Sequence, residues 1–161
     1  KIVKVIFFFY LIEFFGYIWH RNVHHMGLLG NALRVTHWKH HCIDYPAGDM
    51  WTNQMKEKTS KIVDREAFPF TFGAILFSYI CYKNNIINRN DVKLYSIIVL
   101  SMGVLNQYIH DSYHIKNHWL NKYEFYRKNK ICHDIHHRLN CNYGILTYTF
   151  DKIFGTYKSI K

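Results

Sequence analysis

Three long apolar runs constrain the fold of this chain more than any other feature of its sequence. They cover residues 2–19, 68–82 and 92–109, and a polar stretch, 83–91, separates the second run from the third. The first run is long enough to cross a hydrocarbon core of about 30 Å as an α-helix. Backbone groups in lipid must bond within their own segment, which favours helices. The sequence therefore predicts an all-α integral membrane protein with about three spans, of which the last two form a helical hairpin.

A soluble alternative stays open at this point. The second run has 15 residues, which is short for a span, and the mean hydropathy of −0.20 excludes a chain that lies mostly in the membrane. A soluble helical protein with three buried helices would also carry such runs. Aromatic residues make up 18% of the chain, which excludes a disordered protein. The length of 161 residues suits a single domain, 1–161.

Histidine and positive charge share the same parts of the chain. If the first run crosses once and the hairpin crosses out and back, residues 20–67 and 110–161 lie on one side. All 12 histidines and 16 of the 21 Lys and Arg residues fall in these two segments. Positive charge concentrates on the cytoplasmic side of membrane proteins. The sequence thus predicts a cytoplasmic, histidine-rich helical cap, and it explains the net charge of +10 without a nucleic-acid partner.

The histidines form short motifs that are typical of metal sites. Residues three and four apart share one face of a helix, so the imidazoles of each motif are expected to converge. Imidazole is a ligand for Fe, Zn, Cu and Ni. Glu-x-x-His pairs are scarce, which excludes the carboxylate di-iron design of soluble bundles. An all-histidine site for two metals is therefore predicted from four motifs: His20, His24 and His25; His37, His40 and His41; His110, His114 and His118; and His133, His136 and His137.

Other histidine-rich classes fit the pattern less well. A zinc-sequestering protein would favour runs of histidine, and a bis-histidine haem protein needs only two to four ligands inside its spans. The four cysteines form no C-x-x-C pair, so a zinc ribbon is not indicated. Asp111, Asp134 and Asp151 either orient ligand imidazoles or belong to solvated helix surface.

The motifs together resemble the fatty acid hydroxylase superfamily, which includes sterol desaturases, fatty acid 2-hydroxylases and carotenoid hydroxylases. The resemblance covers about residues 13–157. Its most specific part is the last motif, His133, His136 and His137, followed by the segment NYGILTYTFDKIFGTY at residues 142–157. Members of the group commonly have four spans, which implies that an N-terminal helix is missing here.

The resemblance also implies a ligand set. The first motif would supply His20 and His25, although His24 fits the spacing of the sterol branch. His24 and His110 are left over. The ten implied ligands are His20, His25, His37, His40, His41, His114, His118, His133, His136 and His137.

The implied activity is an O2-dependent di-iron hydroxylase or desaturase that oxidises an unactivated C–H bond of a membrane lipid, most simply a fatty acyl chain. It would use two Fe ions per chain, O2 as co-substrate and electrons from a b-type cytochrome or a ferredoxin with its reductase. Iron is favoured because O2 activation needs a redox metal and zinc has no redox chemistry. In a eukaryote the membrane would be the endoplasmic reticulum. The alternatives are a sterol or carotenoid hydroxylase or desaturase, and a non-catalytic membrane metal-binding protein.

Overall fold

All regular structure in the described part of the chain is helical. The computed structural model describes residues 2–25, 31–49, 51–53 and 67–159, and these contain no strand. The predicted all-α fold is therefore confirmed. In chain order the elements are α1 (Ile2–His25), α2 (Asn31–Lys39), the π-helical turn η1 (His40–Asp44), α3 (Ala67–Lys83), α4 (Arg89–Tyr113), the 3-10 turn η2 (Trp119–Lys122), α5 (Glu124–Arg138) and α6 (Thr149–Ile153).

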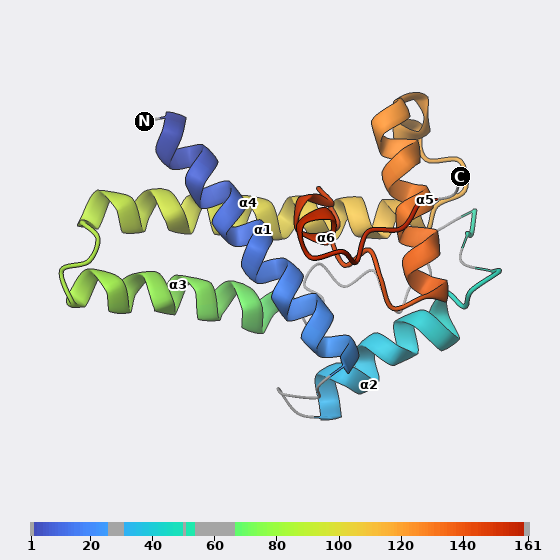
Figure 1. Cartoon of the computed structure of the whole chain (residues 1–161), viewed down its shortest axis with the longest axis horizontal. Helices are drawn as coiled ribbons and strands as arrows, with labels where there is room; N and C mark the ends of the chain where they lie inside the picture. The colour runs from blue at the N-terminus through green and yellow to red at the C-terminus, as the bar shows by residue number, and fades with distance from the viewer. Residues whose placement is uncertain (1, 26–30, 50, 54–66, 160–161) are drawn as a thin grey trace.

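Helices α3 and α4 pack side by side as an antiparallel hairpin (Figure 1). The turn between them is short because Asn85 adopts a left-handed φ of 58° and the Asn88 side chain caps α4 by accepting from the Asp91 backbone N–H at 2.9 Å. The helices approach closely at Gly103, where an added Cβ would lie 3.3 Å from Thr71 Oγ1. The hairpin expected from the second and third apolar runs is thus present.

Helix α1 crosses this hairpin at an angle and packs against α4 (Figure 1). Lys4 Nζ contacts Asp91 Oδ1 at 2.6 Å, which ties the beginnings of the two helices together. The core between them contains Phe8, Ile12, Tyr95, Val99 and Met102. Because both helices start at one end of the molecule, their histidine-bearing ends meet at the other.

Helices α1 and α4 are both long and apolar enough to cross a membrane. With 25 residues α4 measures about 37 Å, whereas the 17 residues of α3 give about 25 Å. Only 17% of the most apolar stretch in α1 and in α4 is buried. The helices instead expose side chains such as Phe7, Leu100 and Val104. Core helices of a soluble protein would be mostly buried, so this outward apolar surface is better matched to lipid.

The C-terminal part of the chain caps the histidine end of the long helices. Helix α5 stands across the far end of α4 (Figure 1). Tyr113, Leu120 and Tyr126 form a small core there. The Tyr126 hydroxyl donates to Ser112 Oγ at 2.9 Å, and Lys130 Nζ donates to the Ile115 carbonyl at 2.5 Å. These contacts fix α5 against the end of α4.

We expect the hairpin turn and the cap to lie on opposite sides of the bilayer. In sealed vesicles made from a chain with Cys42 and Cys81 replaced by serine, the variants Asn85→Cys and Lys116→Cys should react with a membrane-impermeant maleimide from opposite faces, because α4 lies between the two positions. A third variant, Lys158→Cys, should react from the same face as Lys116→Cys. Reaction of all three from one face would contradict a spanning α4.

Candidate metal centre

Nine histidines assemble into two compact groups at the buried end of the long helices. Within each group the ring nitrogens that offer a ligand atom lie within 4.8 Å of one another. Eight of the nine side chains are less than 10% exposed, and His24 is half-buried. The first group contains His20, His24, His37, His41 and His136, and the second contains His40, His114, His133 and His137.

The two His-x-x-His-His motifs are each divided between the groups. The pair four residues apart, His37 and His41, belongs to the first group, and His40 belongs to the second. In α5 the arrangement is reversed, because His133 and His137 join the second group and His136 joins the first. At about 100° per residue, positions i and i+4 point in nearly the same direction whereas i+3 and i+4 diverge. The expected convergence of all three imidazoles therefore holds only for the i, i+4 pairs.

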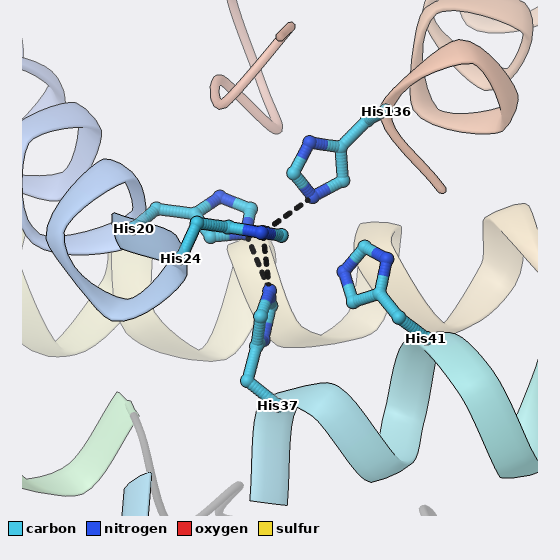
Figure 2. A group of neighbouring side chains, drawn as sticks. All are labelled: His20, His24, His37, His41 and His136. Atoms are coloured by element: carbon cyan, nitrogen blue, oxygen red, sulfur yellow. Dashed lines mark hydrogen bonds between the residues drawn. The ribbon is translucent and has the colours of Figure 1, made fainter. Parts of the chain in front are cut away.

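In the first group the imidazoles point at one another from α1, α2, η1 and α5 (Figure 2). His37 Nε2 lies 2.7 Å from His24 Nε2 and 3.2 Å from His20 Nε2. His24 Nε2 also lies 3.2 Å from His136 Nε2. Metal–imidazole bonds of about 2.1 Å place ligand nitrogens about 3 to 4 Å apart. The two separations of 3.2 Å fit a shared ion, and the closer His37–His24 pair would need to open by about 0.3 Å.

Backbone carbonyls hold three of the rings by their outer nitrogen. His20 Nδ1 lies 2.7 Å from the Tyr143 carbonyl, and His136 Nδ1 lies 2.7 Å from the Cys141 carbonyl. His137 Nδ1 lies 2.9 Å from the Tyr45 carbonyl. A carbonyl only accepts, so each Nδ1 carries the proton and each neutral ring presents the lone pair of Nε2 to the centre of its group. This is the tautomer that a metal ligand requires.

The inward nitrogens outnumber the protons that could join them. One N–H on His37 Nε2 can satisfy only one of its two histidine neighbours. In the second group His133 Nε2 lies between His114 Nε2 at 3.2 Å and His137 Nε2 at 3.1 Å. His40 Nε2 and His41 Nε2 are buried and have no hydrogen-bond partner among the described residues. A cation in each group would receive these lone pairs together, so the donor set fits two metal ions.

Burial favours the neutral form of several histidines in the two groups. Desolvation lowers the pKa of His37, His40, His133 and His136 well below its usual range, and neighbouring imidazoles lower it further. The pKa of His137 falls to about 3, chiefly through desolvation, although its bond to the Tyr45 carbonyl opposes the shift. Neutral imidazole is the form that binds metal.

The two groups are adjacent. The rings of His41 and His137, one from each group, stack with centroids 4.0 Å apart and planes inclined by 25°. Tyr45 stacks on His114 of the second group, with ring centroids 3.9 Å apart. The arrangement thus brings two candidate metal positions into one buried site.

The structure brings together eight of the ten ligands implied by the family resemblance and leaves His25 and His118 outside both groups. His25 Nε2 contacts the Tyr143 hydroxyl at 2.6 Å, whereas His24 takes part in the first group. Because α1 runs without a break through His25, the i, i+4 pair His20 and His24 shares a face. That spacing was the available signal for His24.

His118 is displaced because α4 ends at Tyr113. It caps η2 by accepting from the Leu120 backbone N–H at 3.4 Å, and its Nε2 lies 3.3 Å from the Tyr108 hydroxyl. His110, four residues before His114, is buried instead beside the second group, with ring centroids 4.7 Å from His40 and 4.8 Å from His133.

A cavity of about 130 Å³ reaches the first group from between α1, α3 and α4. Apolar side chains, including Ile12, Phe70 and Ile145, line much of it. His20 and His37 stand in its wall. The cavity therefore joins the apolar helices to the candidate metal position.

Comparison with known proteins identifies the family. The family model described as fatty acid hydroxylase matches residues 5–156. The chain belongs to the fatty acid hydroxylase family. The match includes both histidine groups and the C-terminal segment up to residue 156, and it confirms the resemblance seen in the sequence. Neither the curated proteins nor the solved structures give a match.

We expect the purified chain to bind about two metal ions, one in each group. His41→Ala and His40→Ala should each reduce the count to about one, because each removes a ligand from a different group. His118→Ala should retain both ions, since His118 lies outside the groups. Metal analysis after anaerobic iron loading measures the count. Loss of an ion from His118→Ala would restore His118 as a ligand.

The metal-free protein should lose stability as the pH falls below about 6.5. His37, His40, His133, His136 and His137 have depressed pKa values, so between about pH 3 and 6.5 the unfolded chain binds protons that the folded chain does not. The free energy of unfolding therefore rises with pH across this interval and levels off above it. Thermal unfolding in detergent at pH 7.5, 6.5, 5.5 and 4.5 tests this. A midpoint that does not change from pH 7.5 to 4.5 would contradict burial of neutral histidines.

Proposed function

We propose that this chain is an O2-dependent hydroxylase or desaturase of membrane lipids, with a di-iron centre held by its histidines. The observation that carries the proposal is the pair of histidine groups at the end of an apolar cavity between outward-apolar helices. Membership of the fatty acid hydroxylase family supports the same reaction class. The substrate that fits best is a fatty acyl chain, because the cavity lies among helices suited to lipid.

The nine histidines of the two groups would hold the two ions. Bound iron would supply the redox chemistry that O2 activation requires and that zinc lacks. The protein keeps these imidazoles neutral by burial and orients three of them through the carbonyls of Cys141, Tyr143 and Tyr45. Burial of the two groups limits the entry of bulk water, which would otherwise react at an oxidising centre.

The cavity would position the lipid for oxidation. An acyl chain that enters between α1, α3 and α4 contacts Ile12 and Phe70 and reaches His20 and His37. These contacts hold one C–H bond beside the first group and lower the entropic cost of bringing it there. We assign no acid or base role to a side chain, because the histidines at the site would serve as metal ligands.

Electrons would arrive at the cap from a b-type cytochrome or a ferredoxin with its reductase. Lys116, Lys122 and Arg127 are exposed on the surface of the cap. Positive residues of this kind favour an acidic donor protein by complementary charge. We further propose that the cap faces the cytoplasm, at the endoplasmic reticulum in a eukaryotic cell, in line with the positive-inside rule.

Expression of the chain in a host with a matched electron donor should yield a lipid with one added oxygen or one added double bond. His137→Ala should abolish the product and reduce metal affinity by at least about 10–100-fold, because it opens a ligand position. His118→Ala should keep the product. Lipid mass spectrometry of the host, compared with cells lacking the chain, measures the outcome.

Three other outcomes distinguish the alternatives. A product found only among sterols or carotenoids would replace the acyl substrate. A chain that binds metal, consumes no O2 and changes no lipid would be a metal-binding protein without this activity. Full activity of His137→Ala would remove the second group from the reaction.

A further inference from the structure

One short loop holds the outer nitrogens of two ligand histidines of the first group. The Cys141 carbonyl accepts from His136 and the Tyr143 carbonyl accepts from His20, each at 2.7 Å. The loop, residues 141–144, follows the end of α5 and lies outside any helix, so intrahelical hydrogen bonds do not hold it. Its conformation therefore depends on contacts from elsewhere in the chain.

Asp151 of α6 supplies the central contact. Its side chain is completely buried. Oδ1 accepts from the Tyr143 backbone N–H and Oδ2 from the Gly144 backbone N–H, both at 2.8 Å. Oδ1 also accepts from Thr156 Oγ1 at 2.7 Å. With three donors aimed at it, the side chain acts as an acceptor at both oxygens, which is the hydrogen-bonding pattern of a carboxylate.

The loop is pressed closely onto this carboxylate. A Cβ on Gly144 would lie 3.0 Å from Asp151 Oδ2 and 2.0 Å from the Thr147 carbonyl, so position 144 admits no side chain. Asn142 has a left-handed φ of 55° and donates from Nδ2 to the Cys132 and Lys158 carbonyls at 3.1 and 2.8 Å. The tail of the chain thus fastens the loop to α5.

The geometry connects Asp151 to His20 through a single peptide group. The carbonyl of Tyr143 and the N–H of Gly144 belong to the same peptide unit. Asp151 Oδ2 accepts from that N–H, and the carbonyl at the other end accepts from His20 Nδ1–H. Hydrogen bonds in such a chain polarise one another, so the carboxylate makes the carbonyl a stronger acceptor and His20 a stronger ligand.

We propose that Asp151 is a positioning residue for the first histidine group and acts on His20 through the Tyr143–Gly144 peptide. The inference rests on the proposed metal centre. The second group is independent of this contact, because its anchored ring, His137, bonds to the Tyr45 carbonyl 92 residues away in the chain. Asp151 therefore sets metal affinity in the first group and leaves the second unchanged.

The test measures each group separately by Co²⁺ affinity, using competition with a chromophoric chelator on the metal-free full-length chain in detergent. His137→Ala leaves the first group complete, and His37→Ala leaves the second group complete. Adding Asp151→Asn should weaken Co²⁺ binding about 10–100-fold in the His137→Ala chain, because a donor then replaces one acceptor oxygen. In the His37→Ala chain the affinity should change less than about twofold, because the second group is not anchored through the Tyr143–Gly144 peptide. A general loss of structure would instead weaken binding in both chains.

Asp134→Asn is the matched control. Asp134 is also a buried carboxylate, but its Oδ1 pairs with Arg138 at 3.1 Å, and within the described part of the chain no hydrogen bond joins it to the loop. It should alter neither affinity. Thr156→Val, which removes one donor to Asp151, should weaken the first group even if Asp151→Asn fails to fold, and Thr156→Ser should restore it.

Equal losses in the two backgrounds would overturn the proposal, as would unchanged affinity in the His137→Ala chain. These results differ from failure of the metal centre itself. If neither single-group chain binds Co²⁺ before Asp151 is changed, the proposed function falls and this inference falls with it.

Discussion

His20, His136 and His137 each donate the Nδ1–H group to a backbone carbonyl, and this contact turns the Nε2 lone pair toward a shared centre. An imidazole can bind a metal at the centre of the group only if its unprotonated nitrogen faces that centre. The three carbonyls come from two segments, around Tyr45 and around residues 141–143, which lie far apart in the sequence. The remaining architecture serves to bring these segments to the ends of α1 and α5.

Such a centre is a poor hydrophobic core. Nine imidazoles are largely withdrawn from water, and their buried nitrogens face one another with too few protons between them. Unpaired polar groups in a low-dielectric interior are costly. Packing elsewhere stabilises the fold, through the α1–α4 core around Ile12 and Val99 and the cap core around Tyr113 and Tyr126. Two cations would remove much of the remaining cost, which links metal binding to stability.

The helices could be predicted from the sequence because hydrophobicity is local. The apolar runs 2–19, 68–82 and 92–109 correspond to α1, α3 and α4, each of which extends beyond its run by one to six residues. Polar residues continue the helices, and this extension determines the first histidine pair. In α1 the helix passes through His24 and His25, so the i, i+4 rule selects His24.

Some ligand positions, and the contacts that orient the ligands, could not be predicted from the sequence. They depend on where helices end and on contacts between distant segments. The same rule failed for His118, because α4 stops at Tyr113 and the chain turns into η2. No spacing in the sequence indicates that Asp151 bonds to backbone N–H groups and not to an imidazole. Nor does spacing reveal a bond between His137 and a carbonyl 92 residues away. Such contacts follow from the tertiary fold.

The division of each His-x-x-His-His motif has a mechanical consequence. The α2–η1 segment gives two histidines to the first group and one to the second, whereas α5 gives one and two. Helix α1 contributes only to the first group, and the end of α4 contributes only to the second. The cap elements therefore fix the spacing between the groups, because neither can shift without moving ligands of both. The long helices can each adjust to one group alone. A motif with three histidines in five residues thus places ligands for two neighbouring ions on one rigid turn. Two separate histidine pairs on different elements would leave the spacing between the ions free to vary.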